Sequence, residues 1–120
     1  MQIENLFDEI RKTYYPDWDS GGEWSVKLLS SRDPRLRFAQ GRCDEETKSI
    51  FVNEFQIAGT DPEKLELLLI HEIAHASTRN NHRKEWLAQM KRAAGIAQSI
   101  GRKSLADHIR KQIREYEGSY

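Results

Sequence analysis

The chain has 120 residues, of which 38% are hydrophobic and 32% are charged, and its formal net charge at pH 7 is zero. This size suits a single domain over residues 1–120 with one hydrophobic core, and the composition excludes an intrinsically disordered chain. The only cysteine, Cys43, excludes an intrachain disulfide and a cysteine-based zinc ribbon. We find no signal-peptide pattern and no apolar run long enough to span a membrane, so we expect a soluble, cytoplasmic protein.

The first half of the sequence predicts a helix followed by three strands. Apolar residues recur at helical spacing from Ile3 to Tyr14, and Pro16 disfavours helical geometry in the residue before it, so the helix should end there. Alternating or continuous apolar patterns then predict strands in segments 23–30, 35–38 and 50–52. The connections are short, and parallel pairing needs a long crossover, so we expect a three-stranded antiparallel meander.

The second half predicts three helices. Segment 60–63, Thr-Asp-Pro-Glu, offers an N-cap and a proline at the first helical position. Residues 65–76 are apolar on nearly every side, which predicts a central, buried helix that ends near Asn80 and Asn81. The two helices after it are expected from Arg83 to a stop at Gly95, and from Ser104 onward. A helix, then a sheet, then helices indicate an α+β fold.

The buried helix contains a pattern of three residues that carries chemistry. His71 and His75 are four residues apart, so their rings project from one helix face at the spacing that one tetrahedral zinc ion requires. Glu72 can reach a metal-bound water and take its proton as the water attacks a carbonyl group. The alternative is a pair of core histidines satisfied by hydrogen bonds. Burying these polar groups is costly unless something pairs them, which favours the metal site.

A catalytic zinc usually has three protein ligands and an open position for water. His82 is the first candidate for the third ligand, because it follows the predicted helix end, where the chain can turn back. Glu85 is the competing candidate, although it should lie a turn into the next helix. His108, beside the apolar stripe of the last helix, is expected to be a surface residue.

At this point the sequence resembles a known family. The run HEIAHASTRNNHRKEWLAQMKRAAG is similar to the SprT-like metallopeptidases, which pair this motif with a later histidine, an aromatic residue four positions on and a glycine. Here these residues are His82, Trp86 and Gly95. Segment 41–44, followed by Ile50 and Asn53, resembles the family's strand region. The Asn-His pair before Trp86 is similar to the neighbouring YgjP/WLM-like metallopeptidases.

The resemblance implies a zincin-like fold with Zn²⁺ bound by His71, His75 and His82, and with Glu72 as the general base. We therefore expect a zinc-dependent endopeptidase that acts on proteins or peptides. The alternative is a non-catalytic, zinc-stabilised module that binds nucleic acid or protein. No residue is marked by spacing as the donor that stabilises the developing oxyanion. The candidates are Arg79, Arg83 and the C-terminal tyrosines.

Charge is unevenly distributed along the chain. Residues 1–75 hold 9 Lys/Arg against 15 Asp/Glu, a balance of −6, and residues 76–120 hold 10 against 4, a balance of +6. A basic half can attract nucleic acid, so weak DNA binding through this half is one interpretation. The other is that these side chains are the solvated faces of helices.

Overall fold

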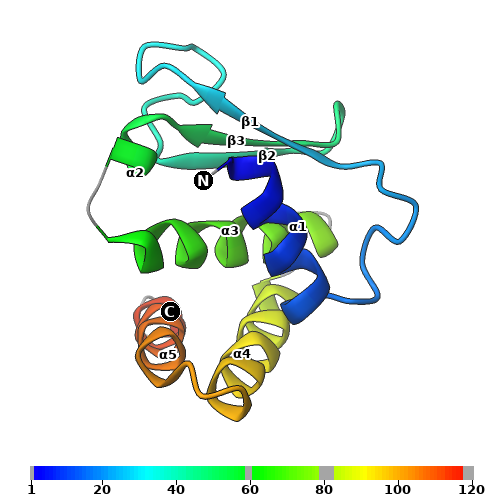
Figure 1. Cartoon of the computed structure of the whole chain (residues 1–120), viewed down its shortest axis with the longest axis vertical. Coiled ribbons are helices and arrows are strands. Elements are labelled where there is room, and N and C mark those ends of the chain that lie inside the picture. The colour runs from blue at the N-terminus through cyan, green and yellow to red at the C-terminus, as the bar shows by residue number, and fades with distance from the viewer. Residues whose placement is uncertain (1, 59–60, 79–82, 118–120) are drawn as a thin grey trace.

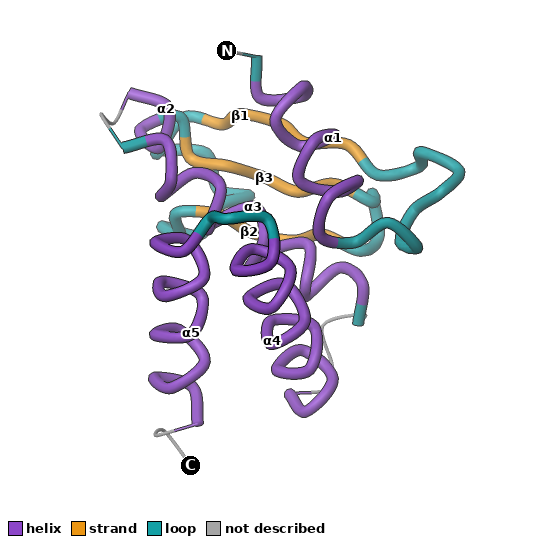
Figure 2. The backbone as a smooth tube through the Cα atoms, turned by 60° about the horizontal axis from the view of Figure 1, so that its bottom comes forward, coloured by secondary structure: helices purple, strands orange, loops and turns teal. Residues whose placement is uncertain are grey.

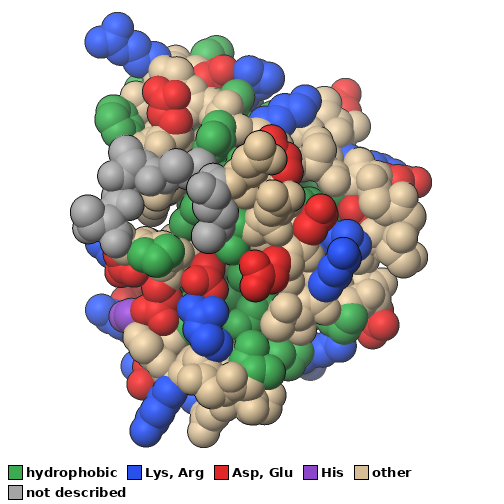
Figure 3. All heavy atoms as spheres, viewed as in Figure 1, with side chains coloured by type: hydrophobic (Ala, Val, Ile, Leu, Met, Phe, Trp, Pro, Cys, Tyr) green, Lys and Arg blue, Asp and Glu red, His purple; other side chains and the backbone are tan. Residues whose placement is uncertain are grey.

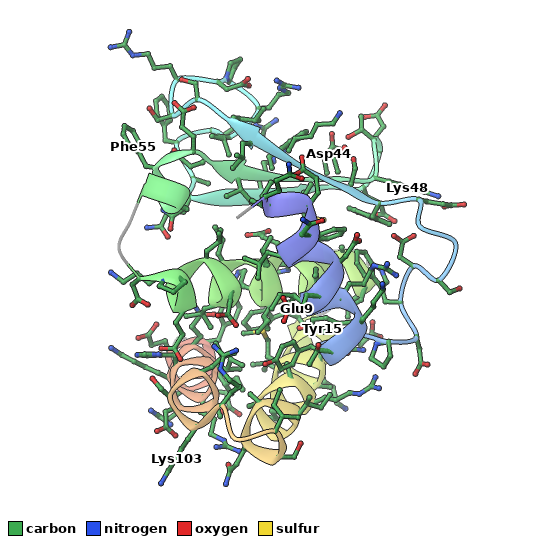
Figure 4. The ribbon with its side chains drawn as sticks, in the orientation of Figure 1. Glu9, Tyr15, Asp44, Lys48, Phe55 and Lys103 are labelled. Atoms are coloured by element: carbon green, nitrogen blue, oxygen red, sulfur yellow. The ribbon has the colours of Figure 1, made fainter. Side chains whose placement is uncertain are left out.

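The first helix forms as its apolar periodicity predicts. The structure is a computed structural model that describes residues 2–58, 61–78 and 83–117. Helix α1 (Ile3–Tyr14) buries one stripe of side chains, and its last residue precedes Tyr15 and Pro16. The Tyr15 hydroxyl donates a 2.9 Å hydrogen bond to the Ile70 carbonyl oxygen, and Figure 4 shows Tyr15 where α1 meets α3. This bond ties the end of α1 to the middle of the central helix.

The three strands form a mixed sheet, so the expected antiparallel meander is only partly right. Strands β1 (Ser25–Leu29), β2 (Gly41–Asp44) and β3 (Ser49–Asn53) have the spatial order β1-β3-β2. β2 and β3 pair antiparallel, as expected for a hairpin, but β1 and β3 pair parallel. The cause is segment 30–40, which carries the chain past the end of the sheet to its far edge, so β3 inserts between the other two strands.

The prediction of a strand in segment 35–38 is wrong. These residues form turns, and the strand lies at 41–44. Leu36 is fully buried, yet it packs with Leu29 and Phe51 on the sheet face away from the main core. Arg37 and Phe38 both have positive φ angles, and Phe38 is 99% exposed. The apolar alternation therefore reflects one buried anchor in a loop rather than one face of a strand.

Helix α3 (Pro62–Ser77) is the central, buried helix that the sequence predicts. It follows the short helix α2 (Phe55–Ala58). Its N-cap is Asp61, whose side chain accepts a hydrogen bond from the Glu63 backbone nitrogen. Figure 1 shows α3 between the sheet and the C-terminal helices, with α1 crossing beside it. Thr60, Asn80 and Asn81, expected at the ends of this helix, lie outside the described residues.

The last two helices form an antiparallel pair. Helix α4 (Arg83–Ser99) and helix α5 (Lys103–Glu117) lie side by side (Figures 1 and 2). The expected stop at Gly95 is wrong, because the buried alanine face of α4 continues past it to Ala97. The helix ends instead at Ser99, and Gly101, with a φ of 85°, supplies the left-handed turn that follows. No helix in the described ranges has the length and apolar character needed to cross a membrane.

Helices and sheet are thus segregated in an α+β arrangement, as expected.

One ion pair fixes the α4–α5 turn against α3. The two terminal nitrogens of Arg102 each lie 2.9 Å from one carboxylate oxygen of Glu66. The Glu66 side chain is 14% exposed and that of Arg102 is 41% exposed. A bidentate contact between an arginine and a carboxylate is stronger than an ion pair made through a single hydrogen bond.

We expect Arg102→Ala to lower the free energy of unfolding by roughly 1 kcal/mol, a value reduced by the solvent exposure of the guanidinium. Urea unfolding at low and high salt measures this, and the loss should shrink as salt screens the pair. Lys103→Ala is the matched control, since Figure 4 shows Lys103 at the far end of the helix pair, pointing away from α3. Equal stability of the two variants would contradict this role for Arg102.

Candidate metal centre

The helix α3 brings its two histidines together on one face. The Nε2 atoms of His71 and His75 are 3.2 Å apart, and the rings lie at 66° with centroids 4.8 Å apart. Both side chains are partly exposed, whereas the neighbouring Ile70, Ile73 and Ala74 are fully buried. The four-residue spacing therefore produces the convergence that the sequence predicts.

This convergence fits a tetrahedral metal ion. Two imidazole nitrogens at about 2.0–2.1 Å from zinc and at a tetrahedral angle lie roughly 3.3–3.4 Å from each other, close to the distance between these two atoms. Burial lowers the pKa of His71, and a hydrogen bond to the Gln112 side-chain oxygen partly opposes this effect. Burial and the neighbouring His71 lower the pKa of His75 to about 4. Both rings are thus neutral at pH 7, as metal ligands must be.

Glu72 is buried beside the first histidine. Glu72 is 6% exposed, and burial raises the pKa of its carboxyl group to about 7. A buried ionisable group with a strongly shifted pKa in a cleft is a marker of a functional site. Glu72 also lines the same cleft as His71, so its carboxyl group has access to what binds there.

The cleft has a volume of about 660 Å³ and lies between the start of β2, α2, α3 and α5. Figure 4 shows Phe55, one of its lining residues, at the end of the sheet opposite Asp44 and Lys48. Gly41 permits a close approach at its wall, because a Cβ atom there would lie 3.0 Å from the Leu68 Cδ1 atom. The size suits a peptide segment or a small molecule.

Two aromatic residues from the C-terminal helices support the histidines. Trp86, 2% exposed, stacks on the His75 ring at 5.2 Å and 23° and meets the His71 ring at 5.1 Å and 68°. Its indole nitrogen donates a 3.4 Å hydrogen bond to the His71 carbonyl oxygen. The Tyr116 ring packs against the Trp86 ring, with the two centroids 4.3 Å apart. Sequence similarity indicated Trp86, whereas Tyr116 was expected only as one of the candidate oxyanion donors and not as a packing partner of Trp86.

Gln112 is a second contact that sequence reasoning missed. Its Oε1 atom lies 3.1 Å from the His71 Nδ1 atom. The two residues are 41 positions apart, so their proximity depends on how α5 packs against α3, and no spacing rule reveals it.

The third ligand remains a prediction. His82, expected in this role, lies outside the described residues. Within the described ranges, no three His, Cys, Asp or Glu side chains form a group suited to a metal ion, so Glu85 does not complete the site there. His108 lies at the surface, as expected. Its side chain is 51% exposed, and its Nδ1 atom lies 3.1 Å from the Glu63 Oε2 atom.

The expected oxyanion donors also remain untested. Arg79 and Tyr120 lie outside the described residues, as does the side chain of Arg83. The ring of Tyr116 packs against Trp86.

Comparison with known proteins gives one match. The family model described as the SprT-like family matches residues 3–107. No curated protein and no solved structure matches the chain.

The buried Glu72 should make the metal-free protein less stable as pH rises. An unfolded glutamate titrates near pH 4.5, whereas the folded pKa is about 7, so the folded state resists ionisation and loses stability between these values. Glu72→Gln removes this loss. In chelator-treated protein, we expect the variant's stability relative to wild type to rise by roughly 2 kcal/mol between pH 5 and pH 8. Urea unfolding at both pH values tests this, and identical pH dependence of the two proteins would contradict it.

Proposed function

The chain belongs to the SprT-like family, and on that premise we propose that it is a zinc-dependent endopeptidase. The observation that supports this best is the 3.2 Å convergence of the His71 and His75 Nε2 atoms beside the buried Glu72, which lines an open cleft together with His71. We propose His71, His75 and His82 as the zinc ligands, with His82 assigned from the sequence alone. Zinc, when bound, would act as a Lewis acid and lower the pKa of a bound water toward neutrality.

Glu72 is the proposed general base. A base works best when its pKa lies near the operating pH, and burial brings the pKa of this carboxyl group to about 7. Glu72 lies among the buried residues of α3, as do its apolar neighbours Ile73 and Ala76. It takes the proton of the attacking water and returns it to the leaving amine, a cycle that needs no other titratable side chain.

The peptide substrate is proposed to lie along β2. This strand is at the edge of the sheet, and Gly41 at its start lines the cleft opposite His71 and Glu72. An extended peptide that pairs with this edge would place its carbonyl groups over the site. Phe55, 64% exposed, borders the same cleft with Leu67 and Leu68. We therefore expect a preference for apolar side chains near the scissile bond.

The alternative, a non-catalytic zinc-stabilised binding module, predicts a closed site. A structural zinc site usually has four protein ligands and no open position. Here His71 and Glu72 both line an open cleft, which supports catalysis.

We expect one zinc ion per chain after dialysis, and we expect Glu72→Gln to retain the zinc while losing hydrolysis. The amide has nearly the shape of the carboxylate but cannot accept the proton, so the rate should fall by about 10²–10⁴-fold. Elemental analysis and cleavage of a labelled, unfolded protein measure the two properties.

Glu115→Gln, the same change at an exposed position of α5, is the matched control and should leave both properties unchanged. Full activity in Glu72→Gln would assign the base to another group. A protein without zinc would end the metal-centre proposal.

A second candidate function is weak binding of single-stranded nucleic acid. In the basic C-terminal half, Lys91, Arg92 and Arg102 form ion pairs with Glu117, Asp17 and Glu66. On the face in Figure 3, acidic and basic side chains are interspersed, so this face does not present one sign of charge.

Basic residues are more concentrated in segment 27–42 than in the C-terminal half. This segment holds five Lys/Arg and one Asp. Within it, the ring of Phe38 is 99% exposed, and Arg37 and Phe38 both have positive φ. A protruding aromatic ring among cations is suited to stacking on a base between phosphates.

We expect labelled oligothymidylate to bind at low salt and to dissociate as salt rises, with a slope of about −0.7 in log affinity for each phosphate contact. Phe38→Ala should weaken binding by about 5-fold or more, because it removes one stacking surface. Lys103→Gln tests the alternative location in the C-terminal half. Fluorescence anisotropy measures all three proteins. A flat titration at low ionic strength would remove this function and leave the peptidase proposal intact.

A further inference from the structure

Helix α5 contacts the central helix through a row of side chains that ends at the metal centre. Residues 104, 108, 112 and 116 are spaced by four, so they share one face of α5. Ser104 and His108 both contact the Glu63 Oε2 atom, at 3.0 and 3.1 Å. Gln112 contacts His71, two turns further along α3, at 3.1 Å. Figure 1 shows α5 crossing below α3, and the third contact in the row falls on a proposed ligand.

We infer that Gln112 is a positioning residue for the metal centre, which holds His71 in the tautomer that leaves its Nε2 atom free to bind metal. This inference rests on the proposed zinc site. An amide oxygen can only accept a hydrogen bond, so the His71 Nδ1 atom, 3.1 Å from Gln112 Oε1, carries the proton. In a neutral imidazole the other nitrogen then has a lone pair. That nitrogen points at His75 Nε2, 3.2 Å away.

The surroundings of Gln112 fix its position. Its neighbours on α5, Ile109 and Ile113, are 0% and 5% exposed and belong to the main core. One turn later, Tyr116 packs on Trp86 at 4.3 Å, and Trp86 in turn stacks on His75. Helix α5 therefore contacts His71 directly through a hydrogen bond and is linked to His75 through Trp86 of α4.

This support comes from a part of the chain beyond the family match, which ends at residue 107. Partners that hold the second nitrogen of a ligating histidine typically change metal affinity by about 10–100-fold when they are removed. Gln112 also lines the cleft, so its side chain borders the place where substrate and metal would meet. The C-terminal half of α5 is thus part of the site rather than only part of the core.

The hydrogen bond can be tested without activity and without metal. In metal-free protein, imidazole ¹⁵N NMR should show His71 protonated at Nδ1. Gln112→Leu has a side chain of similar size that cannot accept a hydrogen bond, so it should shift His71 toward the Nε2-protonated tautomer. Gln112→Glu, which can still accept, should keep the wild-type tautomer. Gln98→Leu makes the same change at an exposed position of α4 and should leave His71 unchanged.

Zinc affinity, measured by competition with a chelator, is the second readout. Gln112→Leu should weaken zinc binding by about 10–100-fold, whereas Gln112→Glu and Gln98→Leu should bind as wild type or tighter. Urea unfolding of each metal-free variant shows whether the fold is kept. Unchanged zinc affinity in a folded Gln112→Leu protein would overturn the inference.

The two proposals fail in different ways. A wild-type His71 protonated at Nε2 would overturn the role of Gln112 whether or not zinc binds. A wild-type protein that binds no zinc, but has His71 protonated at Nδ1, would overturn the metal centre and the positioning of a ligand by Gln112. It would still establish the hydrogen bond between α5 and α3.

Discussion

Helix α3 has to bury two opposing kinds of side chain along the same few turns. Its apolar residues Leu69, Ile70 and Ile73 are fully buried, while His71, Glu72 and His75 alternate with them. An apolar surface is stabilised by exclusion of water, but imidazole and carboxyl groups lose hydration in the same environment. The lowered pKa values of both histidines and the raised pKa of Glu72 are direct consequences. A bound cation that pairs with these groups would offset that cost.

The elements around α3 can be understood from this constraint. The sheet covers one side of the helix and leaves the edge strand β2 beside the cleft (Figure 1). The α4–α5 pair covers the other side and supplies Trp86 and Gln112 to the histidines. α1 is fixed to the helix through Tyr15, which donates to the Ile70 carbonyl oxygen. These elements surround the polar residues of α3, while His71 and Glu72 still line the cleft.

Local sequence signals predicted what is local in this fold. The α+β class, α1, the buried character of α3 and the His71–His75 pair all follow from periodicity and spacing within a few turns. The signals failed where distant packing decides. Leu36 is buried without belonging to a strand, and α4 continues through Gly95 because its alanine face stays buried.

The mixed sheet and the Gln112–His71 contact escaped prediction for the same reason. The parallel pairing of β1 with β3 depends on the path of segment 30–40, and no turn signal records that path. Gln112 meets His71 across 41 residues. Such contacts arise from the assembled core, so only the structure identifies the second row of residues around the candidate site.

The central claim is that the polar face of α3 is a metal site, and anomalous diffraction from crystals grown with zinc tests it most directly. We predict one strong zinc peak between the Nε2 atoms of His71 and His75, with Glu72 adjacent but not bound to it. A peak elsewhere, or none, with the two imidazoles still hydrogen-bonded to each other, would contradict the account.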